Sequence, residues 1–149
     1  MSYVTEATAW LSDDINDHVK ALIARFYELA DSKQPDAGHL MASEVFTDDA
    51  VLISPQGRMA GFREISKSRD TAWSVVSSRS HTISKVFAGG AKSPELALLG
   101  AVNMGFTNGK GVTSPFAVHI KLTDLNAPPS QLRITFMEVF AVSLFALFS

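Results

Sequence analysis

The chain has 149 residues, 46% hydrophobic and 19% charged, which is a globular composition that fits one domain over residues 1–149. Its net charge of −2 excludes a strongly basic surface, so we expect neither nucleic acid nor an anionic membrane as a partner. The absence of cysteine excludes disulfides, thiolate nucleophiles and cysteine-ligated zinc.

The first part of the chain is predicted to be helical. Ser12, followed by Asp13 and Asp14, is typical of a helix start, because the hydroxyl can cap and the acids favour the positive end of the helix dipole. Apolar residues then recur at helical spacing up to position 30, which predicts an amphipathic helix of about five turns that ends before Pro35. Residues 37–45 predict a short second helix.

A short strand and a third helix are predicted next. Asp48 and Asp49 are turn formers, and residues 50–53 form an apolar run suited to a buried strand. Pro55 cannot donate to a sheet ladder, so the strand should stop there in a tight turn. Gly61 permits a further change of direction before a helix over about residues 62–76.

The second half of the chain predicts four long strands. They cover residues 82–87, 95–106, 112–123 and 131–142, and Asn108-Gly109 is a strong hairpin signal between the second and the third. Short loops between consecutive strands favour an antiparallel meander over a parallel sheet. Because the strands are apolar on both faces, the helices should cover one face and a second subunit the other.

This order of elements resembles the nuclear-transport-factor-two-like (NTF2-like) superfamily, and within it the SnoaL-like group. The residues that carry the resemblance are Phe26-Tyr27 and Asp31, Val45-Phe46 before residues 48–50, and the glycine pattern Pro55-x-Gly57-x-x-x-Gly61-x-x-x-Ile65. The resemblance implies an α+β cone in which three N-terminal helices pack on a curved, mainly antiparallel sheet that encloses an apolar pocket. Such proteins are often homodimers, and they include isomerases, dehydratases, polyketide cyclases and members without catalytic activity.

Comparison with particular members narrows the chemistry. Ketosteroid isomerases use a catalytic tyrosine and two aspartates. In the resemblance these fall on Phe26, Ser54 and a position near Ala117. Because all three catalytic side chains are missing here, the isomerase mechanism is not expected. The chain is more similar to scytalone dehydratase, whose aspartate in an Asp-Ser-Lys run matches Asp31 and whose strand-opening histidine matches His81.

The same comparison leaves other positions unmatched. Two water-holding tyrosines of the dehydratase fall near Ala30 and Pro55 and are absent here. For cyclases of the SnoaL type, the nearest acid late in the sheet is Glu138.

Four residues are candidates for catalysis. A histidine can exchange a proton near neutral pH, so His81 is the expected acid or base, with Asp31 orienting it or sharing its proton. Tyr27 lies four residues before Asp31 on the same helix face, and it or Asn103 could stabilise developing negative charge. Each residue also has a purely structural alternative. His81 could hydrogen-bond to a loop carbonyl, Asp31 could cap a turn, Tyr27 could be a packing residue, and Asn103 could lie on a solvent-exposed face of its strand.

An apolar substrate pocket is expected around these groups. Trp73 could stack on a flat substrate, whereas the neighbouring Arg69 and Arg79 are expected to be surface ion-pair partners. The residues expected to line the pocket are Phe26, Ile53, Trp73, Met104, Phe116, His119, Glu138 and Phe140.

The sequence predicts chemistry without a cofactor or metal. Histidines do not share a helix face, and neither a glycine-rich phosphate loop nor a Gly-x-Ser-x-Gly elbow occurs. We expect a fungal-type enzyme of secondary metabolism, a dehydratase, isomerase or cyclase, that moves protons on a hydrophobic polyketide- or terpenoid-like molecule. The alternative is a non-catalytic NTF2-like dimer that binds an apolar ligand or a partner protein.

Two further expectations concern location and assembly. No basic segment followed by an apolar block opens the chain, and the apolar stretch 139–148 is too short to span a bilayer, which favours a cytoplasmic protein. If residues 139–148 were exposed, they would form an apolar patch prone to association. We therefore expect them to pack across a dimer interface or against the mouth of the cone.

Overall fold

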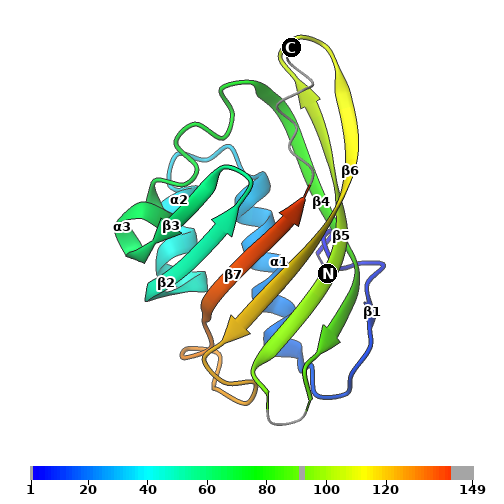
Figure 1. Ribbon diagram of the computed structural model, residues 1–149, viewed down its shortest axis with the longest axis vertical. Coiled ribbons are helices and arrows are strands. Elements are labelled where there is room, and N and C mark those ends of the chain that lie inside the picture. The colour runs from blue at the N-terminus through cyan, green and yellow to red at the C-terminus, as the bar shows by residue number, and fades with distance from the viewer. Residues whose placement is uncertain (1, 91–92, 142–149) are drawn as a thin grey trace.

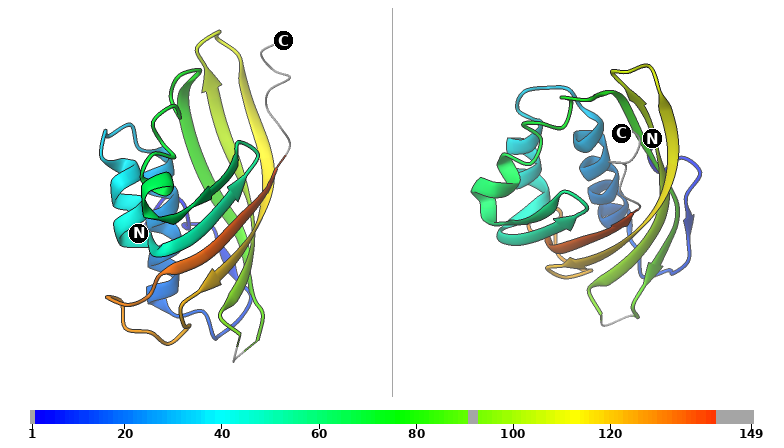
Figure 2. Two further views of the ribbon diagram at one scale, coloured as in Figure 1. Left: turned by 60° about the vertical axis from the view of Figure 1, so that its left-hand side comes forward. Right: turned by 45° about the horizontal axis from the view of Figure 1, so that its top comes forward.

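The computed structural model describes residues 2–90 and 93–141. One mixed sheet of seven strands curves around helix α1 (Figures 1 and 2), with the strand order β1-β4-β5-β6-β7-β2-β3. The helices are α1 (Asp17–Asp31), α2 (Ala37–Leu40), which continues as the π-helical turn η1 (Met41–Val45), and α3 (Gly61–Ser66). The strands are β1 (Ala9–Trp10), β2 (Phe46–Ser54), β3 (Gly57–Ala60), β4 (Val76–Ala88), β5 (Glu95–Phe106), β6 (Gly111–Leu122) and β7 (Ile134–Ala141).

The predicted meander is confirmed. Strands β4, β5, β6 and β7 pair in sequence, each antiparallel to the next, and β5 has the predicted bounds. The hairpin between β5 and β6 turns at Gly109, whose φ of +84° is a conformation that glycine adopts without strain. Strand β4 begins six residues earlier than expected, and the predicted end of the last strand at residue 142 lies outside the described residues.

Helix α1 is shorter than predicted, because its cap is not the predicted one. Asn16 caps it, since its Oδ1 accepts the N–H of Val19 at 3.0 Å while its Nδ2 donates to the carbonyl of Leu125 at 2.9 Å. Ser12 instead closes a local turn by accepting the N–H of Asp14. Asn16 therefore caps the helix in place of the predicted Ser12, because its side chain also hydrogen-bonds to the loop after β6.

The region around β2 contains one wrong prediction and one missed strand. Asp48 and Asp49 are exposed residues within β2, where the pairing with β7 shifts register between Phe46 and Val51, and they do not form a turn. Strand β2 stops before Pro55 as predicted, but the chain then folds back as β3. Gly57, with a φ of +130°, occupies that tight turn.

Helix α3 ends ten residues before the predicted position. Its last residue, Ser66, lies so close to α2 that a Cβ on Gly38 would be 2.2 Å from the Ser66 carbonyl oxygen. The following residues 67–75 form turns, and from them Arg69 and Trp73 donate hydrogen bonds to the C-terminal carbonyls of α1. These tertiary hydrogen bonds satisfy carbonyls that no helix neighbour can reach.

The two faces of the sheet have different roles. Successive strand residues point to opposite faces, and residues paired across strands share a face. The inner face, covered by the helices, carries the core, with Ile83, Leu98, Ile120 and Met137 almost completely buried. The outer face exposes apolar side chains, among them Phe87, Leu99 and Phe140. None of the described helices is long and apolar enough to cross a membrane.

Candidate functional site

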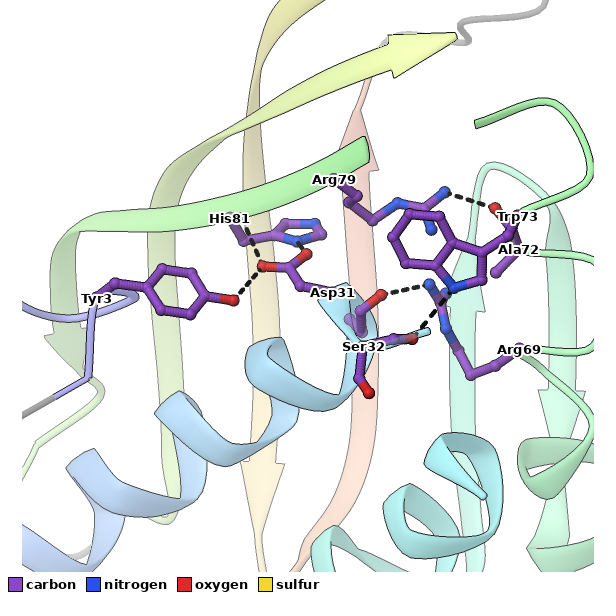
Figure 3. Close-up of polar contacts among 9 residues, drawn as sticks. Tyr3, Asp31, Ser32, Arg69, Ala72, Trp73, Arg79 and His81 are labelled. Atoms are coloured by element: carbon purple, nitrogen blue, oxygen red, sulfur yellow. Dashed lines mark hydrogen bonds and ion pairs between the residues drawn. The ribbon is translucent and has the colours of Figure 1, made fainter. Parts of the chain in front are cut away.

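The structure brings Asp31 and His81 together, 50 residues apart in the chain. Asp31 is the last residue of α1, and His81 lies on the inner face of β4. Their side chains meet with 2.6 Å between Asp31 Oδ1 and His81 Nδ1, and both are largely buried, with 6% and 15% of the side chain exposed (Figure 3). The two candidates that the sequence ranked first for acid–base chemistry therefore form a hydrogen-bonded pair.

Three donors hold the Asp31 carboxylate. Besides the contact to Nδ1, its Oδ2 accepts the main-chain N–H of His81 at 2.8 Å and the hydroxyl of Tyr3 at 2.7 Å (Figure 3). A carboxylate at a helix C-terminus faces the negative end of the helix dipole, so simple capping would not favour it there. The side chain instead reaches across to β4 and fixes the orientation of the histidine.

The contact with Asp31 determines which nitrogen of His81 is available. An ionised carboxylate only accepts hydrogen bonds, so Nδ1 carries the proton in this pairing and Nε2 presents a lone pair. Nε2 has no hydrogen-bond partner among the described residues. This is the arrangement expected of a general base.

Two aromatic rings enclose His81. The ring centroids of Tyr27 and Phe116 lie 4.9 and 5.6 Å from that of His81 and 5.8 Å from each other. Phe116 can lie there because its neighbour across the strand pair is Gly100, where a Cβ would be 2.7 Å from the Phe116 ring. These contacts restrict the rotation of the imidazole ring.

The ring of Tyr27 lies against His81, and its hydroxyl is buried and has no hydrogen-bond partner among the described residues. Burial, and secondarily the charge of Asp31, raises the pKa of Tyr27 above its ordinary value. The phenol therefore stays protonated and can donate to an oxygen that develops negative charge next to the histidine. An unpaired buried hydroxyl costs free energy, so its retention is consistent with a function outside packing.

Arg69 and Arg79 are not the surface ion-pair partners that the sequence suggested. Both are partly buried and flank Trp73 at the end of α1, and neither forms an ion pair with a carboxylate among the described residues (Figure 3). Arg79 lies over the Trp73 ring at 4.9 Å from its centroid. Trp73 contributes to a small apolar cluster with Val76, Val102, Met104, Phe106 and Val112.

Several expected pocket residues lie on the other side of the sheet. Asn103 is exposed on the outer face, where its Oδ1 accepts the hydroxyl of Thr113, and it therefore does not join His81. Four further residues that were expected to line the pocket also lie on the outer face. Successive residues of a strand point to opposite faces, so an error of one position in the expected register moves a side chain from one face to the other. These corrected positions are Ile53, His119, Glu138 and Phe140, whereas Phe26, Met104 and Phe116 are buried on the inner side.

Two polar residues, one at the site and one in the same cross-strand row as His81, were not candidates from the sequence. Tyr3 comes from the turns before β1, and partial burial together with its hydrogen bond to Asp31 raises its pKa. Ser114 is a buried polar residue on the inner face, in the same cross-strand row as His81 and Val102. No local signal marks Tyr3, while Ser114 could have been noticed as a polar residue within an apolar strand.

An open depression lies at one end of the sheet, and neither Asp31 nor His81 is among its lining residues. Its volume is about 500 Å³, and β4, β5 and β6 line it with residues from both faces of the sheet, among them Asn103 and Thr113 from the outer face and Arg79, Met104 and Val112 from the inner face. His81 lies two residues from Arg79 on the same face of β4. Among the described residues, no three His, Cys, Asp or Glu side chains converge as a metal site would require.

Comparisons with known proteins identify the fold. No protein-family profile and no curated protein sequence matches this chain. Among solved structures, a ketosteroid isomerase-like protein from Catenulispora acidiphila in complex with trimethylamine is similar with a TM-score of 0.64 and 15% identity, over 83% of this chain and 85% of that chain. An NTF2-like superfamily protein from Salmonella enterica has a TM-score of 0.63 and 13% identity, over 85% and 90%.

A third similar structure is that of an enzyme. The hexachlorocyclohexane dehydrochlorinase LinA type 2 has a TM-score of 0.61 and 12% identity, over 85% of this chain and 84% of that chain. At these identities the likeness concerns the fold alone. The chain has an NTF2-like α+β fold, in which both enzymes and proteins of unknown function occur.

Proposed function

We propose that this protein is a cofactor-independent enzyme that moves protons on a hydrophobic small molecule, as a dehydratase, an isomerase or a cyclase. The observation that carries the proposal is the hydrogen bond between Asp31 Oδ1 and His81 Nδ1, which leaves Nε2 as a base beside the buried phenol of Tyr27. An NTF2-like fold that also holds a dehydrochlorinase is compatible with proton abstraction from carbon.

The geometry suggests a simple sequence of proton transfers. Nε2 of His81 takes a proton from a substrate carbon, so that a C–H bond breaks, an N–H bond forms, and the electron pair moves toward a carbonyl oxygen of the substrate. Tyr27 donates a hydrogen bond to that oxygen, and Asp31 stabilises the imidazolium. Returning the proton to another carbon isomerises the substrate, whereas returning it to a departing hydroxyl releases water.

Finer assignments belong to the same proposal. We place the protein in the SnoaL-like group, with an apolar pocket between helices and sheet, a cytoplasmic location and a polyketide- or terpenoid-like substrate of secondary metabolism. A homodimer is proposed because the outer face exposes Phe87, Leu99 and Phe140, three large apolar side chains that a second subunit could cover. The expected contact of the tail concerns the apolar stretch 139–148, of which residues 142–148 lie outside the described residues.

Proton exchange in deuterated water tests the proposal. The wild-type protein is incubated with a panel of enones and β-hydroxy ketones, and mass spectrometry follows deuterium incorporation and loss of water. His81→Ala should slow exchange about 100-fold or more, since general base catalysis contributes that much. Asp31→Asn should slow it about 10- to 100-fold, as when an orienting partner of a histidine is lost.

His18→Ala is the matched control, because His18 is exposed on α1 and should leave the rate unchanged. Unchanged exchange in His81→Ala would disprove the proposed base. If the wild-type protein binds members of the panel without any exchange, the non-catalytic alternative becomes the better description.

A further inference from the structure

Arg69 and Arg79 lie next to the C-terminal end of α1, and each has side-chain N–H groups that no acceptor among the described residues binds. Arg69 Nη2 donates to the carbonyl of Ala30 at 2.5 Å, and Arg79 Nη2 donates to the carbonyl of Ala72 at 3.2 Å (Figure 3). Arg69 Nε and Arg79 Nη1 are also buried, yet they have no hydrogen-bond partner in the part of the chain that the structure describes. A native fold rarely leaves two charged donors in this state without a reason.

The two guanidinium charges are poorly compensated. Burial, and next the charge of Arg79, lowers the pKa of Arg69 to about 10, and burial likewise lowers the pKa of Arg79. Asp31 is the acid whose charge acts favourably on both, but its oxygens already accept hydrogen bonds from Tyr3 and His81. An anion near the arginines would relieve their mutual repulsion and provide acceptors for the unpaired N–H groups.

We propose that Arg69 and Arg79 bind the carboxylate of the substrate, so that the protein acts on a small organic acid with an apolar body. The planar fork of an arginine matches the two oxygens of a carboxylate. While His81 acts as a base its ring is uncharged, and the two guanidiniums and the Asp31 carboxylate then carry a net charge of +1. That charge suits a monoanionic carboxylate better than a phosphate, which carries about −1.5 to −2 near neutral pH.

The position of Arg79 links this site to the catalytic pair. Arg79 and His81 are two residues apart on the inner face of β4, which separates their Cα atoms by about 7 Å. A carboxylate at Arg79 would thus place carbon atoms a few bonds away beside the imidazole. Met104 and Val112, which share the cross-strand row of Arg79 and pack in the apolar cluster with Trp73, offer apolar contacts to the rest of the molecule. The inference therefore rests on the proposed function and specifies its substrate class.

Calorimetric titration of the full chain with matched probes tests the inference. The probes are cinnamate, the uncharged cinnamamide of the same shape, and inorganic phosphate. We expect cinnamate to bind about 10- to 100-fold more tightly than the amide, the range for losing one or two charge-assisted hydrogen bonds, and more tightly than phosphate. No cinnamate binding at millimolar concentration, equal binding of acid and amide, or tighter binding of phosphate would each overturn the inference.

Variants locate the binding site. Arg79→Gln and Arg69→Gln should each weaken cinnamate binding about 10-fold or more while leaving amide binding unchanged. Arg79→Lys keeps the charge but not the fork, so an intermediate affinity is expected, and circular dichroism checks that each variant folds. Arg58→Gln, on the exposed β2–β3 hairpin, is the matched control and should bind as the wild-type protein does.

The two proposals fail in different ways. His81→Ala should lose the exchange activity but keep the preference for acid over amide, so an unchanged exchange rate in His81→Ala with this preference intact would refute only the catalytic proposal. Equal turnover of an acid and of its matched amide, with Arg79→Gln changing neither rate, would refute only the carboxylate site.

Discussion

The carboxylate of Asp31 contacts His81 twice: Oδ1 lies 2.6 Å from the ring nitrogen Nδ1, and Oδ2 accepts the main-chain N–H at 2.8 Å. One side chain thereby ties the end of α1 to the middle of β4 and sets both the position and the tautomer of the histidine. Because the same oxygens hold the strand and the ring, structural and catalytic effects of mutating Asp31 must be separated experimentally.

Asp31→Ala should lower the free energy of unfolding by about 2–3 kcal/mol. The substitution leaves the His81 N–H and the ring Nδ1 without their acceptor in a largely buried place. Urea denaturation measures the change, and Asp13→Ala, at an exposed position outside α1, should alter stability by less than about 0.5 kcal/mol. Equal stability of both variants would show that the Asp31 contacts contribute nothing to the fold.

Tyr3→Phe should reduce the catalytic rate about 2- to 10-fold and leave the Michaelis constant unchanged. The phenyl ring remains while one hydrogen bond to Asp31 Oδ2 is lost, which is worth about 0.5–1.5 kcal/mol. Steady-state kinetics on a substrate found by the exchange assay provide the measurement. A rate equal to that of the wild-type protein would exclude Tyr3 as a positioning residue.

Gly100→Ala should displace Phe116 from His81 and destabilise the fold by about 1–3 kcal/mol. The new Cβ would lie 2.6 Å from the carbonyl oxygen of Thr82 and 2.7 Å from the Phe116 ring. Gly111→Ala is the comparison, because its Cβ would come no closer than 3.3 Å to its nearest neighbour, the carbonyl oxygen of Met104. Thermal unfolding should separate the two variants, and equal melting temperatures would contradict the predicted clash.

Neither tyrosine of the chain should ionise at pH 10 in the folded protein. The chain contains two tyrosines, Tyr3 and Tyr27, and burial is the first cause that raises the pKa of each. Ultraviolet absorbance of phenolate should therefore remain low at pH 10 in the native protein but reach about half its maximum in the denatured chain. A native titration midpoint near pH 10 for both tyrosines would contradict the burial of Tyr27.

The raised pKa values of the two tyrosines also affect the free energy of unfolding at high pH. Above pH 10 the unfolded chain loses phenolic protons that the folded state keeps, so the contribution of the tyrosines to stability is full below pH 10 and is lost as the pH rises toward the folded pKa. Arg69, whose pKa is lowered to about 10, acts in the opposite sense between its folded and unfolded values. The free energy of unfolding of the wild type minus that of Tyr27→Phe isolates the phenol, and this signed difference should fall as the pH rises above 10.

Leu99→Lys should weaken the proposed homodimer. Leu99 and Phe140 both pair with Ala117 across the outer face, so one lysine places a charge in the centre of the exposed apolar row. Light scattering after size exclusion measures the mass, and Lys67→Gln, at an exposed position in the turns after α3, serves as a surface control. A wild-type protein that is monomeric at all concentrations would refute the dimer.

Much of the fold follows from local patterns in the sequence. Helical spacing of apolar residues predicted α1, and Asn108-Gly109 with long apolar runs on either side predicted the β5–β6 hairpin. Such signals are readable because period and turn chemistry are properties of a few neighbouring residues. Asp31 and His81 were also candidates from the sequence, through a resemblance that extends over the order of all the elements.

Only the tertiary structure decided which side chains meet. Strand side chains alternate between faces, and since both faces are apolar, the pattern could not show that His81 points inward while Asn103 points outward. The contacts of Tyr3, Arg69 and Arg79 likewise depend on segments that come together through folding. The sequence alone determined α1, the antiparallel meander and the candidates Asp31, His81 and Tyr27. Packing, register and long-range hydrogen bonds determined the site, because those interactions join residues that are distant along the chain.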